Sequence, residues 1–297
     1  MKKDSMFIEK AYAKINLFLH VTDKRPDGYH ILDSLVVFPD VGDELILFPV
    51  SGSKEDRLVE LEITGQFVSQ LSQENQDDNL IVKAAYKLAA CTKQPLKPVK
   101  IQLIKNLPVA SGIGGGSSDA AATLRLLMRY WNLVIDNDLL QKIALQLGAD
   151  VPVCLNPVTQ RMQGIGEVIS RDIEIPSFGM ILVNHGEGVS TAEVFKKRQS
   201  SFFDKVNLKN SFDNVNSFIH DITTYDNNLQ EPAILLNSKI EKVLEEIRML
   251  PHCRLARMSG SGATCFGLFE TVEQAQKAAE ILSSKYSWWI WGGKAIH

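Results

Sequence analysis

Alternating apolar and polar positions mark strands in the first third of the chain. From Ala11 to Val21 the odd-numbered positions are all apolar, whereas Lys14, Asn16 and His20 lie at even-numbered positions. A period of two is typical of a strand with one buried face. Further strands are predicted at 29–38, 44–50, 58–63 and 99–104.

Helical spacing of apolar residues alternates with short apolar runs in the rest of the chain. It predicts helices over 79–90, from Ser117 or Ser118 to about 131, over 137–147 and over 238–249, and strands at 179–184 and 288–295. Thr271 and Gln274 have the spacing of a capping box. Because strands and helices mix without strict βαβ alternation, we expect an α+β fold. A domain change is expected near Pro176, before the strand at 179–184, which gives two domains, 1–176 and 177–297.

Composition excludes several classes of protein. With 45% hydrophobic and 23% charged residues the chain has a globular composition, and its net charge of −3 argues against a general nucleic-acid binder. No apolar run approaches a membrane span, and Met1–Phe7 lacks the apolar core of a signal peptide. The 4 cysteines are scattered, which favours reduced thiols in the cytoplasm, and the 6 histidines lack ligand spacing, so no protein-bound zinc site is expected.

A glycine-rich segment between Leu107 and Asp119 carries the clearest chemistry. Glycines at 112, 114, 115 and 116 precede two serines and a predicted helix. Glycine lets a ligand approach the backbone, and a helix N-terminus offers unpaired N–H groups and partial positive charge, so the segment predicts a phosphate site. It is neither a Walker A loop nor a dinucleotide fingerprint. A plain glycine turn is the alternative. Asp119 is expected to complement the helix dipole.

Three further features suggest a polar site. Lys14 and Asn16 share one face of the first strand; a solvated lysine is the alternative interpretation. Asp150 stands between Gly148, the expected C-cap of the helix 137–147, and Pro152; a turn or cap aspartate is the alternative. In the turn that ends at His30, aromatic and imidazole rings could stack on a base, although a solvated turn would look the same.

Taken together, these blocks resemble the GHMP kinases, the family of galactokinase, homoserine kinase, mevalonate kinase and phosphomevalonate kinase. The resemblance runs from about Ala11 to about Phe269 and includes a second glycine-hydroxyl cluster, Ser259–Thr264. Four sequence segments resemble one branch of this family in particular. That branch phosphorylates the C2 hydroxyl of a cytidine diphosphate-linked methylerythritol in non-mevalonate isoprenoid synthesis. The segments are Ala13-Lys-Ile-Asn-Leu-Phe-Leu19, Arg25-Pro-Asp-Gly-Tyr-His30, Asp78-Asn-Leu-Ile81 and Leu147-Gly-Ala-Asp-Val-Pro152.

The resemblance implies a fold and a set of roles. It implies a ribosomal S5 domain 2-like N-terminal lobe, a ferredoxin-like C-terminal lobe, and ATP with Mg²⁺ as cofactors. Asp150 would be the catalytic base and Lys14 its cationic partner, which also offsets charge on the reacting oxygens. The ATP-phosphate loop would comprise Pro108, Val109, Ala110, Ser111, Gly112, Ile113, Gly114, Gly115, Gly116, Ser117 and Ser118. Substrate contacts would come from Asn16, Tyr29, His30, Thr191 and Phe195.

Some alternatives stay open. Residues 156–162 depart from the family pattern, which leaves the shape of the chain after Asp150 undetermined. A GHMP kinase for another small alcohol, such as homoserine or mevalonate, is one rival, and a non-catalytic nucleotide-binding protein on the same fold is another. A core aromatic on a helix is the alternative for Phe195. The sequence leaves the oligomeric state, including a homodimer, open.

Overall fold

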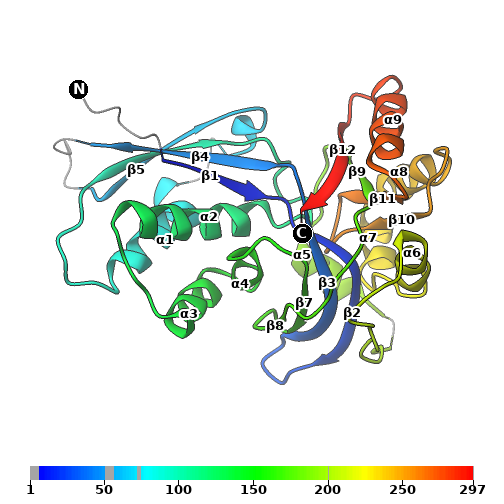
Figure 1. Ribbon diagram of the computed structural model, residues 1–297, viewed down its shortest axis with the longest axis horizontal. Coiled ribbons are helices and arrows are strands. Elements are labelled where there is room, and N and C mark those ends of the chain that lie inside the picture. The colour runs from blue at the N-terminus through cyan, green and yellow to red at the C-terminus, as the bar shows by residue number, and fades with distance from the viewer. Residues whose placement is uncertain (1–6, 51–56, 72–74, 200, 297) are drawn as a thin grey trace. The chain divides into compact units, whose positions relative to one another are not determined.

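The computed structural model describes residues 7–50, 57–71, 75–199 and 201–296, and these form two compact units (Figure 1). The described residues of unit 1 fall within Met1–Ala13, Gly42–Val109 and Gly115–Asn156. Unit 2 comprises Lys14–Val41, Ala110–Gly114 and the described part of Pro157–His297. Both units are therefore built from chain segments that are distant in sequence.

Unit 1 contains a 4-stranded sheet in the order β1-β4-β6-β5. Its pairs are antiparallel except that β5 runs parallel to β6. Alternate residues of β6, namely Val99, Ile101 and Leu103, are buried, as the period of two predicts. The strands are β1 (Phe7–Tyr12), β4 (Gly42–Pro49), β5 (Val59–Thr64) and β6 (Val99–Ile104).

Helices α1 and α2 lie along this sheet, as Figure 1 shows. Every residue of α2 from Ser118 to Leu124 is buried, and so are Leu126 and Leu127, so this helix is covered on more than one side. Asn79 caps α1 by accepting from the backbone N–H of Ile81. The helical segments are η1 (Val68–Gln70), η2 (Gln76–Asp78), α1 (Leu80–Ala89), α2 (Gly115–Tyr130), α3 (Asn137–Leu147) and α4 (Val151–Cys154).

Unit 2 contains an 8-stranded sheet in the order β10-β11-β9-β12-β3-β7-β8, with β2 paired to β3. All of its strand pairs are antiparallel. The central strand β9 is buried along its whole length. The strands are β2 (Ile15–Lys24), β3 (His30–Pro39), β7 (Gln160–Gly164), β8 (Val168–Ser170), β9 (Gly179–Asn184), β10 (Leu255–Met258), β11 (Cys265–Phe269) and β12 (Trp289–Ile296).

The helices of unit 2 bury apolar stripes in one core with β9 and β11. Ile240, Val243 and Ile247 of α8 are fully buried there, together with Ala275 and Leu282 of α9. The capping box at Thr271 and Gln274 is confirmed: each side chain accepts from the other residue's backbone N–H. The helices are α5 (Thr191–Lys197), α6 (Val215–Thr223), α7 (Gln230–Leu236), α8 (Lys239–Arg248) and α9 (Val272–Ser283).

Most predicted elements are confirmed, and so is the α+β class. The continuous strand from Ala11 to Val21 is wrong, because the chain leaves β1 at Tyr12 and starts β2 at Ile15 in another sheet. Positions of both parities are buried from Ala13 to Val21, so β2 is not half-buried. Helix α2 starts at Gly115, earlier than predicted.

For membrane helices, disulfides and metal clusters, the statements below apply to the described residues alone. No helix in the described ranges has the length and apolar character that a bilayer span requires. Within those ranges no two cysteines form a disulfide, and no three His, Cys, Asp or Glu side chains are grouped to hold a metal ion. Residues 1–6, on which most of the signal-peptide argument depends, lie outside the described ranges.

Candidate active site

The middle of the glycine-rich segment, Ala110–Gly114, belongs to unit 2 and has an unusual backbone. Ala110, Gly112 and Gly114 have φ of 49°, 74° and 65°. A Cβ on Gly112 would lie 2.5 Å from the carbonyl oxygen of Ser259 and 2.7 Å from the nitrogen of Gly262. Gly112 is therefore required both by its left-handed backbone and by close approach.

The second glycine-hydroxyl cluster, Ser259–Thr264, is bonded to this segment. The backbone N–H of Thr264 donates to the carbonyl of Ser111 over 3.0 Å. The Ser259 hydroxyl donates to the carbonyl of Gly112 over 3.1 Å. Two motifs about 150 residues apart in sequence thus form one hydrogen-bonded loop pair in unit 2.

Lys14 is buried beside the glycine segment, with 3% of its surface exposed, so the solvated-lysine interpretation is wrong. Its backbone N–H donates to the carbonyl of Ile113 over 2.8 Å. A Cβ on Gly114 would lie 3.2 Å from Cβ and 3.3 Å from Cε of Lys14. The stem of the lysine therefore runs along Gly114, which has no side chain to displace it.

Asn16 follows Lys14 on β2 and is fully buried. Its backbone N–H donates to the Ser259 hydroxyl over 3.1 Å, and its Nδ2 donates to the Ser34 hydroxyl over 2.7 Å. Its Oδ1 is buried and has no hydrogen-bond partner among the described residues. Buried polar atoms nearly always have a partner, so this oxygen marks a place for a ligand or water donor.

The remainder of the predicted phosphate loop lies in unit 1. Pro108 and Val109 are the last residues of unit 1 before the chain enters unit 2 at Ala110. After the chain returns to unit 1, Gly115–Ser118 form the first turn of α2. The first N–H groups of a helix have no intrahelical acceptor, and this turn carries no acidic residue. The Ser118 hydroxyl donates to the Tyr12 carbonyl over 2.6 Å, so it has a structural role, whereas Ser117 is half-buried on the same turn.

Asp119 lies early in α2 and is buried, and its main partner is another charged side chain. Its buried carboxylate pairs with the ammonium of Lys105 over 2.8 Å, and the same ammonium pairs with Asp43 over 2.5 Å. Asp43 also accepts from the backbone N–H groups of Asn106 and Leu107 over 2.6 and 2.8 Å. These three charged side chains, Asp43, Lys105 and Asp119, are called the charge cluster below.

The charge cluster perturbs the titration of its members. Burial raises the pKa of Asp119, Lys105 opposes the rise, Asp43 adds to it, and the result is about 7. Burial alone would lower the pKa of Lys105, but Asp119 and Asp43 together raise it. A Cβ on Gly115 would lie 3.2 Å from the Lys105 Nζ, so the cluster lies directly against the first residue of α2.

Asp150 precedes the short helix α4 in unit 1 and is half-buried. Its backbone is αR, and Pro152 lies in the first turn. Asp150 stands in a turn and at the N-cap position of α4, as the alternative interpretation expected, although its carboxylate accepts no capping hydrogen bond from the described backbone of that helix. Gly148 is the C-cap of α3, as predicted.

The turn before β3 presents the predicted base-binding residues. Tyr29 is 57% exposed, and its carbonyl accepts from the N–H of Arg25 over 2.7 Å. The ring of His30 stacks on Phe195 with centroids 4.6 Å apart and 20° between the planes. Burial, with Lys24 and Arg198 adding to the effect, lowers the pKa of His30, which favours a neutral imidazole.

Thr191 begins α5, the helix that carries Phe195. The hydroxyls of Thr191 and Ser261 lie 2.8 Å apart, so α5 is bonded to the Ser259–Thr264 cluster. In unit 2 the structure thus joins Asn16 and Thr191 to one loop pair, and joins His30 to Phe195. Tyr29 stays a solvent-facing ring on the same turn as His30.

Sequence reasoning missed the residues that hold this arrangement. Ser34, Asp43 and Lys105 belong to none of the motifs that the sequence analysis singled out. A weak signal exists for Lys105, which is a charged residue directly after the alternating strand β6 and before the glycine segment.

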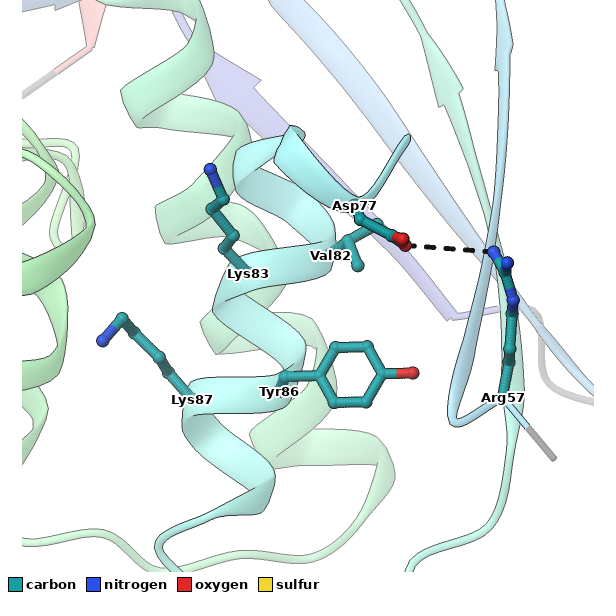
Figure 2. A pocket seen from close by; sticks show the side chains of 6 residues that line it. All are labelled: Arg57, Asp77, Val82, Lys83, Tyr86 and Lys87. Carbon is teal, nitrogen blue, oxygen red and sulfur yellow. Dashed lines mark ion pairs between the residues drawn. The ribbon is translucent and has the colours of Figure 1, made fainter. Parts of the chain in front are cut away.

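One surface groove has none of the predicted site residues in its lining (Figure 2). It measures about 550 Å³ and follows α1 in unit 1. Arg57 pairs with Asp77 over 3.9 Å, Lys83 pairs with Asp78 over 3.0 Å, and Lys87 donates to Gln146 over 2.9 Å. Two of its three cations are thus paired with carboxylates, and the third, Lys87, is bonded to a neutral amide. The lining residues are Arg57, Asp77, Val82, Lys83, Tyr86 and Lys87.

The chain matches two family models. Residues 79–156 match the GHMP kinases N terminal domain, and residues 205–287 match the GHMP kinases C terminal model. The two matches fall on either side of the predicted boundary at 176/177, which itself stays a prediction.

Among known proteins, the chain is 45% identical over 288 residues to a 4-diphosphocytidyl-2-C-methyl-D-erythritol kinase of Gluconacetobacter diazotrophicus, covering 96% of this chain and 93% of that protein. A protein of the same name from Granulibacter bethesdensis is 46% identical, with 95% and 92% covered. A crystal structure of 4-(cytidine 5'-diphospho)-2C-methyl-D-erythritol kinase superposes with a TM-score of 0.78 at 30% identity, covering 98% of this chain and 99% of that one. Homoserine kinase from Cytophaga hutchinsonii, at 14% identity, TM-score 0.71 and 99% and 96% coverage, shares the fold.

Proposed function

The chain belongs to the GHMP kinase family, and on that premise we propose that it transfers the γ-phosphoryl group of ATP to the C2 hydroxyl of 4-diphosphocytidyl-2-C-methyl-D-erythritol. Membership of the family makes the chain a phosphotransferase that uses ATP. The observation that carries the substrate assignment is similarity, over nearly the whole chain, to relatives with that enzyme's name. The pathway would be non-mevalonate isoprenoid synthesis.

The first turn of α2 supports a phosphate site. Gly115 and Gly116 have no side chain to obstruct a ligand, and the helix N-terminus offers N–H donors and partial positive charge. We assign ATP phosphates to the segment Pro108–Ser118. The donors fit an anion; with no acidic residue on this turn, Mg²⁺ would be held by the phosphates and the Ser117 hydroxyl. When bound, Mg²⁺ supplies neutralisation of the phosphate charge.

Asp150 and Lys14 would carry the chemistry. We assign Asp150 as the base that accepts the proton of the C2 hydroxyl, and Lys14 as the cation that offsets charge on the reacting oxygens. Support for Asp150 is a half-buried carboxylate at the start of the short helix α4. Support for Lys14 is that the residue is buried and that the methylene groups of its side chain lie along Gly114.

The cytidine end would be recognised by aromatic rings on unit 2. Tyr29 offers an exposed face for stacking, and His30, as a neutral imidazole, can both donate to and accept from a base edge. The His30 ring covers one face of Phe195, so Phe195 has only its other face for the cytosine. Asn16 and Thr191 would contact the rest of the substrate.

A coupled ADP-release assay tests the proposal. The purified chain is given ATP, Mg²⁺ and one of three acceptors: the cytidine diphosphate-linked methylerythritol, homoserine or mevalonate. ADP release with the first acceptor alone supports the assignment. Release with homoserine or mevalonate instead would establish the rival kinase, and nucleotide binding without release would establish the non-catalytic rival.

The remaining expectations are part of the same proposal. We divide the chain into family domains at 176/177, place the enzyme in the cytoplasm and include a homodimer as its assembly. Sedimentation of the purified chain at several concentrations tests the dimer, and cell fractionation tests the location.

A further inference from the structure

We propose that Ser34 is a positioning residue that turns the Asn16 amide so that only its Oδ1 faces the substrate, and that the site therefore selects a hydrogen-bond donor there. This inference depends on the proposed function, because it takes the phosphate acceptor as the ligand beside Asn16. It adds a residue of β3 that no motif contains. It also adds the chemical class of the substrate group, a hydroxyl, that Asn16 reads.

The hydrogen bonds of Ser34 fix the orientation of the amide. The single proton of the Ser34 hydroxyl is donated to the carbonyl of Phe18 over 2.6 Å. Only lone pairs are left to face Asn16, so the amide atom 2.7 Å away must be the donor Nδ2. A flipped amide would bring two acceptors together. Oδ1 consequently points the other way.

The backbone of Asn16 is fixed as firmly as its side chain. The Ser259 hydroxyl accepts from the Asn16 N–H and donates to Gly112, both over 3.1 Å. Two residues earlier, the N–H of Lys14 donates to Ile113 over 2.8 Å. These bonds hold the backbone of Asn16 in register with the glycine segment, and the bond to Ser34 then sets the direction of its side-chain amide.

The orphaned oxygen then determines what can bind. Asn16 is fully buried, and its Oδ1 has no donor within the described part of the chain. An unsatisfied buried acceptor is costly, and a ligand hydroxyl removes that cost. A ligand with a carbonyl or ether oxygen at the same place would set acceptor against acceptor. A site built around a hydrogen bond rejects analogues that lack it far more strongly than an apolar pocket rejects a missing methylene.

Three substitutions at Ser34 separate hydrogen bonding from packing. Ser34→Ala removes the acceptor; Ser34→Cys keeps similar size but offers only a weak sulfur acceptor; Ser34→Thr keeps the hydroxyl. Ser170→Ala, at a half-buried serine on β8, is the matched control. We expect Ala and Cys to lower kcat/KM for the acceptor about tenfold, as one misdirected hydrogen bond would. KM for ATP should stay unchanged, Thr should recover most of the loss, and the control should have no effect.

A double-mutant cycle with Asn16→Ala shows whether Ser34 acts through Asn16. If it does, Ser34→Ala costs nothing further in the Asn16→Ala background. If Ser34→Ala still lowered kcat/KM for the acceptor about tenfold in that background, the inference would be overturned. A rise of about tenfold in KM for ATP would overturn it too.

The wild-type chain keeps the two proposals distinguishable. If it turns over homoserine or mevalonate instead, the substrate assignment fails and the same cycle is measured with that acceptor. If no acceptor is turned over, the cycle is measured on urea midpoints. There, strictly additive losses would disprove the Ser34–Asn16 coupling.

Discussion

Replacing Asp119 by asparagine should change how the stability of the protein depends on pH. The carboxylate shares one buried ammonium with Asp43, so the three groups carry a formal net charge of −1 when all are ionised. The substitution keeps the shape and removes the charge. The pKa of Asp119 is about 7 in the fold against an ordinary value of 3.8.

The sign and size of the effect follow from proton linkage. Between about pH 4 and pH 7 the folded state holds a proton on Asp119 that the unfolded state has released, so raising the pH favours unfolding. At about 1.4 kcal/mol per pH unit, the wild type loses up to about 4 kcal/mol of stability over this range through this one group. The asparagine side chain of the variant cannot titrate. The difference in the free energy of unfolding, Asp119→Asn minus wild type, should therefore increase by up to about 4 kcal/mol as the pH is raised from about 4 to about 7.

Urea unfolding at half-unit steps from about pH 4.5 to about pH 8 measures this difference. Subtracting the unfolding free energies of the two proteins at each pH cancels the contributions of carboxylates elsewhere in the chain. Lys105 has a raised pKa and therefore titrates only well above this pH range. Asp138→Asn, at an exposed carboxylate in the first turn of α3, is the control and should run parallel to wild type. Parallel curves for Asp119→Asn as well would refute the account of a proton-binding cluster.

Three further substitutions test the site. Asp150→Asn should lower kcat by about 10²–10⁴-fold and leave KM for ATP unchanged in the ADP-release assay; near-normal kcat would remove the base assignment. Tyr29→Ala should raise KM for the cytidine substrate by roughly one to two powers of ten, and Tyr29→Phe far less; a rise confined to ATP would contradict stacking. Gly186→Ala, with φ of +97° and nothing within 4 Å, should lower the free energy of unfolding by about 1–3 kcal/mol through backbone strain alone. Gly112→Ala should cost more, because its Cβ would also lie 2.5 Å from the Ser259 carbonyl oxygen; equal losses in both would deny the close approach.

The sequence was sufficient for elements whose pattern is local. β6 and β9 were predicted residue for residue because a period of two or a short apolar run needs no distant partner to be recognised. Capping at Thr271 is likewise encoded within four residues. The family motifs supplied the candidate site residues, and the structure joins Asn16 to the Ser259 loop as separate motifs could not reveal.

What failed depends on contacts between distant segments. In sequence Lys14 could be a solvated lysine and Asp119 a partner of the helix dipole, and only contacts with distant segments show that both are buried. The break between β1 and β2 is invisible to periodicity, because apolar alternation continues while the strand exchanges one sheet for another. Ser34 has no sequence signal at all. Its role depends on a side-chain contact that engages Nδ2 of Asn16 and leaves Oδ1 without a partner among the described residues.

The discontinuity of the two units has a consequence for synthesis on the ribosome. The segments of unit 1 have all been made once residue 156 has been translated, but β3 pairs with β7, where Ser34 stands opposite Met162. At about 5–20 residues per second, the β2–β3 hairpin waits on the order of 6–30 s for that strand. During this interval a nascent chain exposes an apolar, unpaired strand edge, which is a site for aggregation or chaperone binding. Limited proteolysis of ribosome-stalled chains should cut the hairpin in a chain of about 160 residues and spare it at full length.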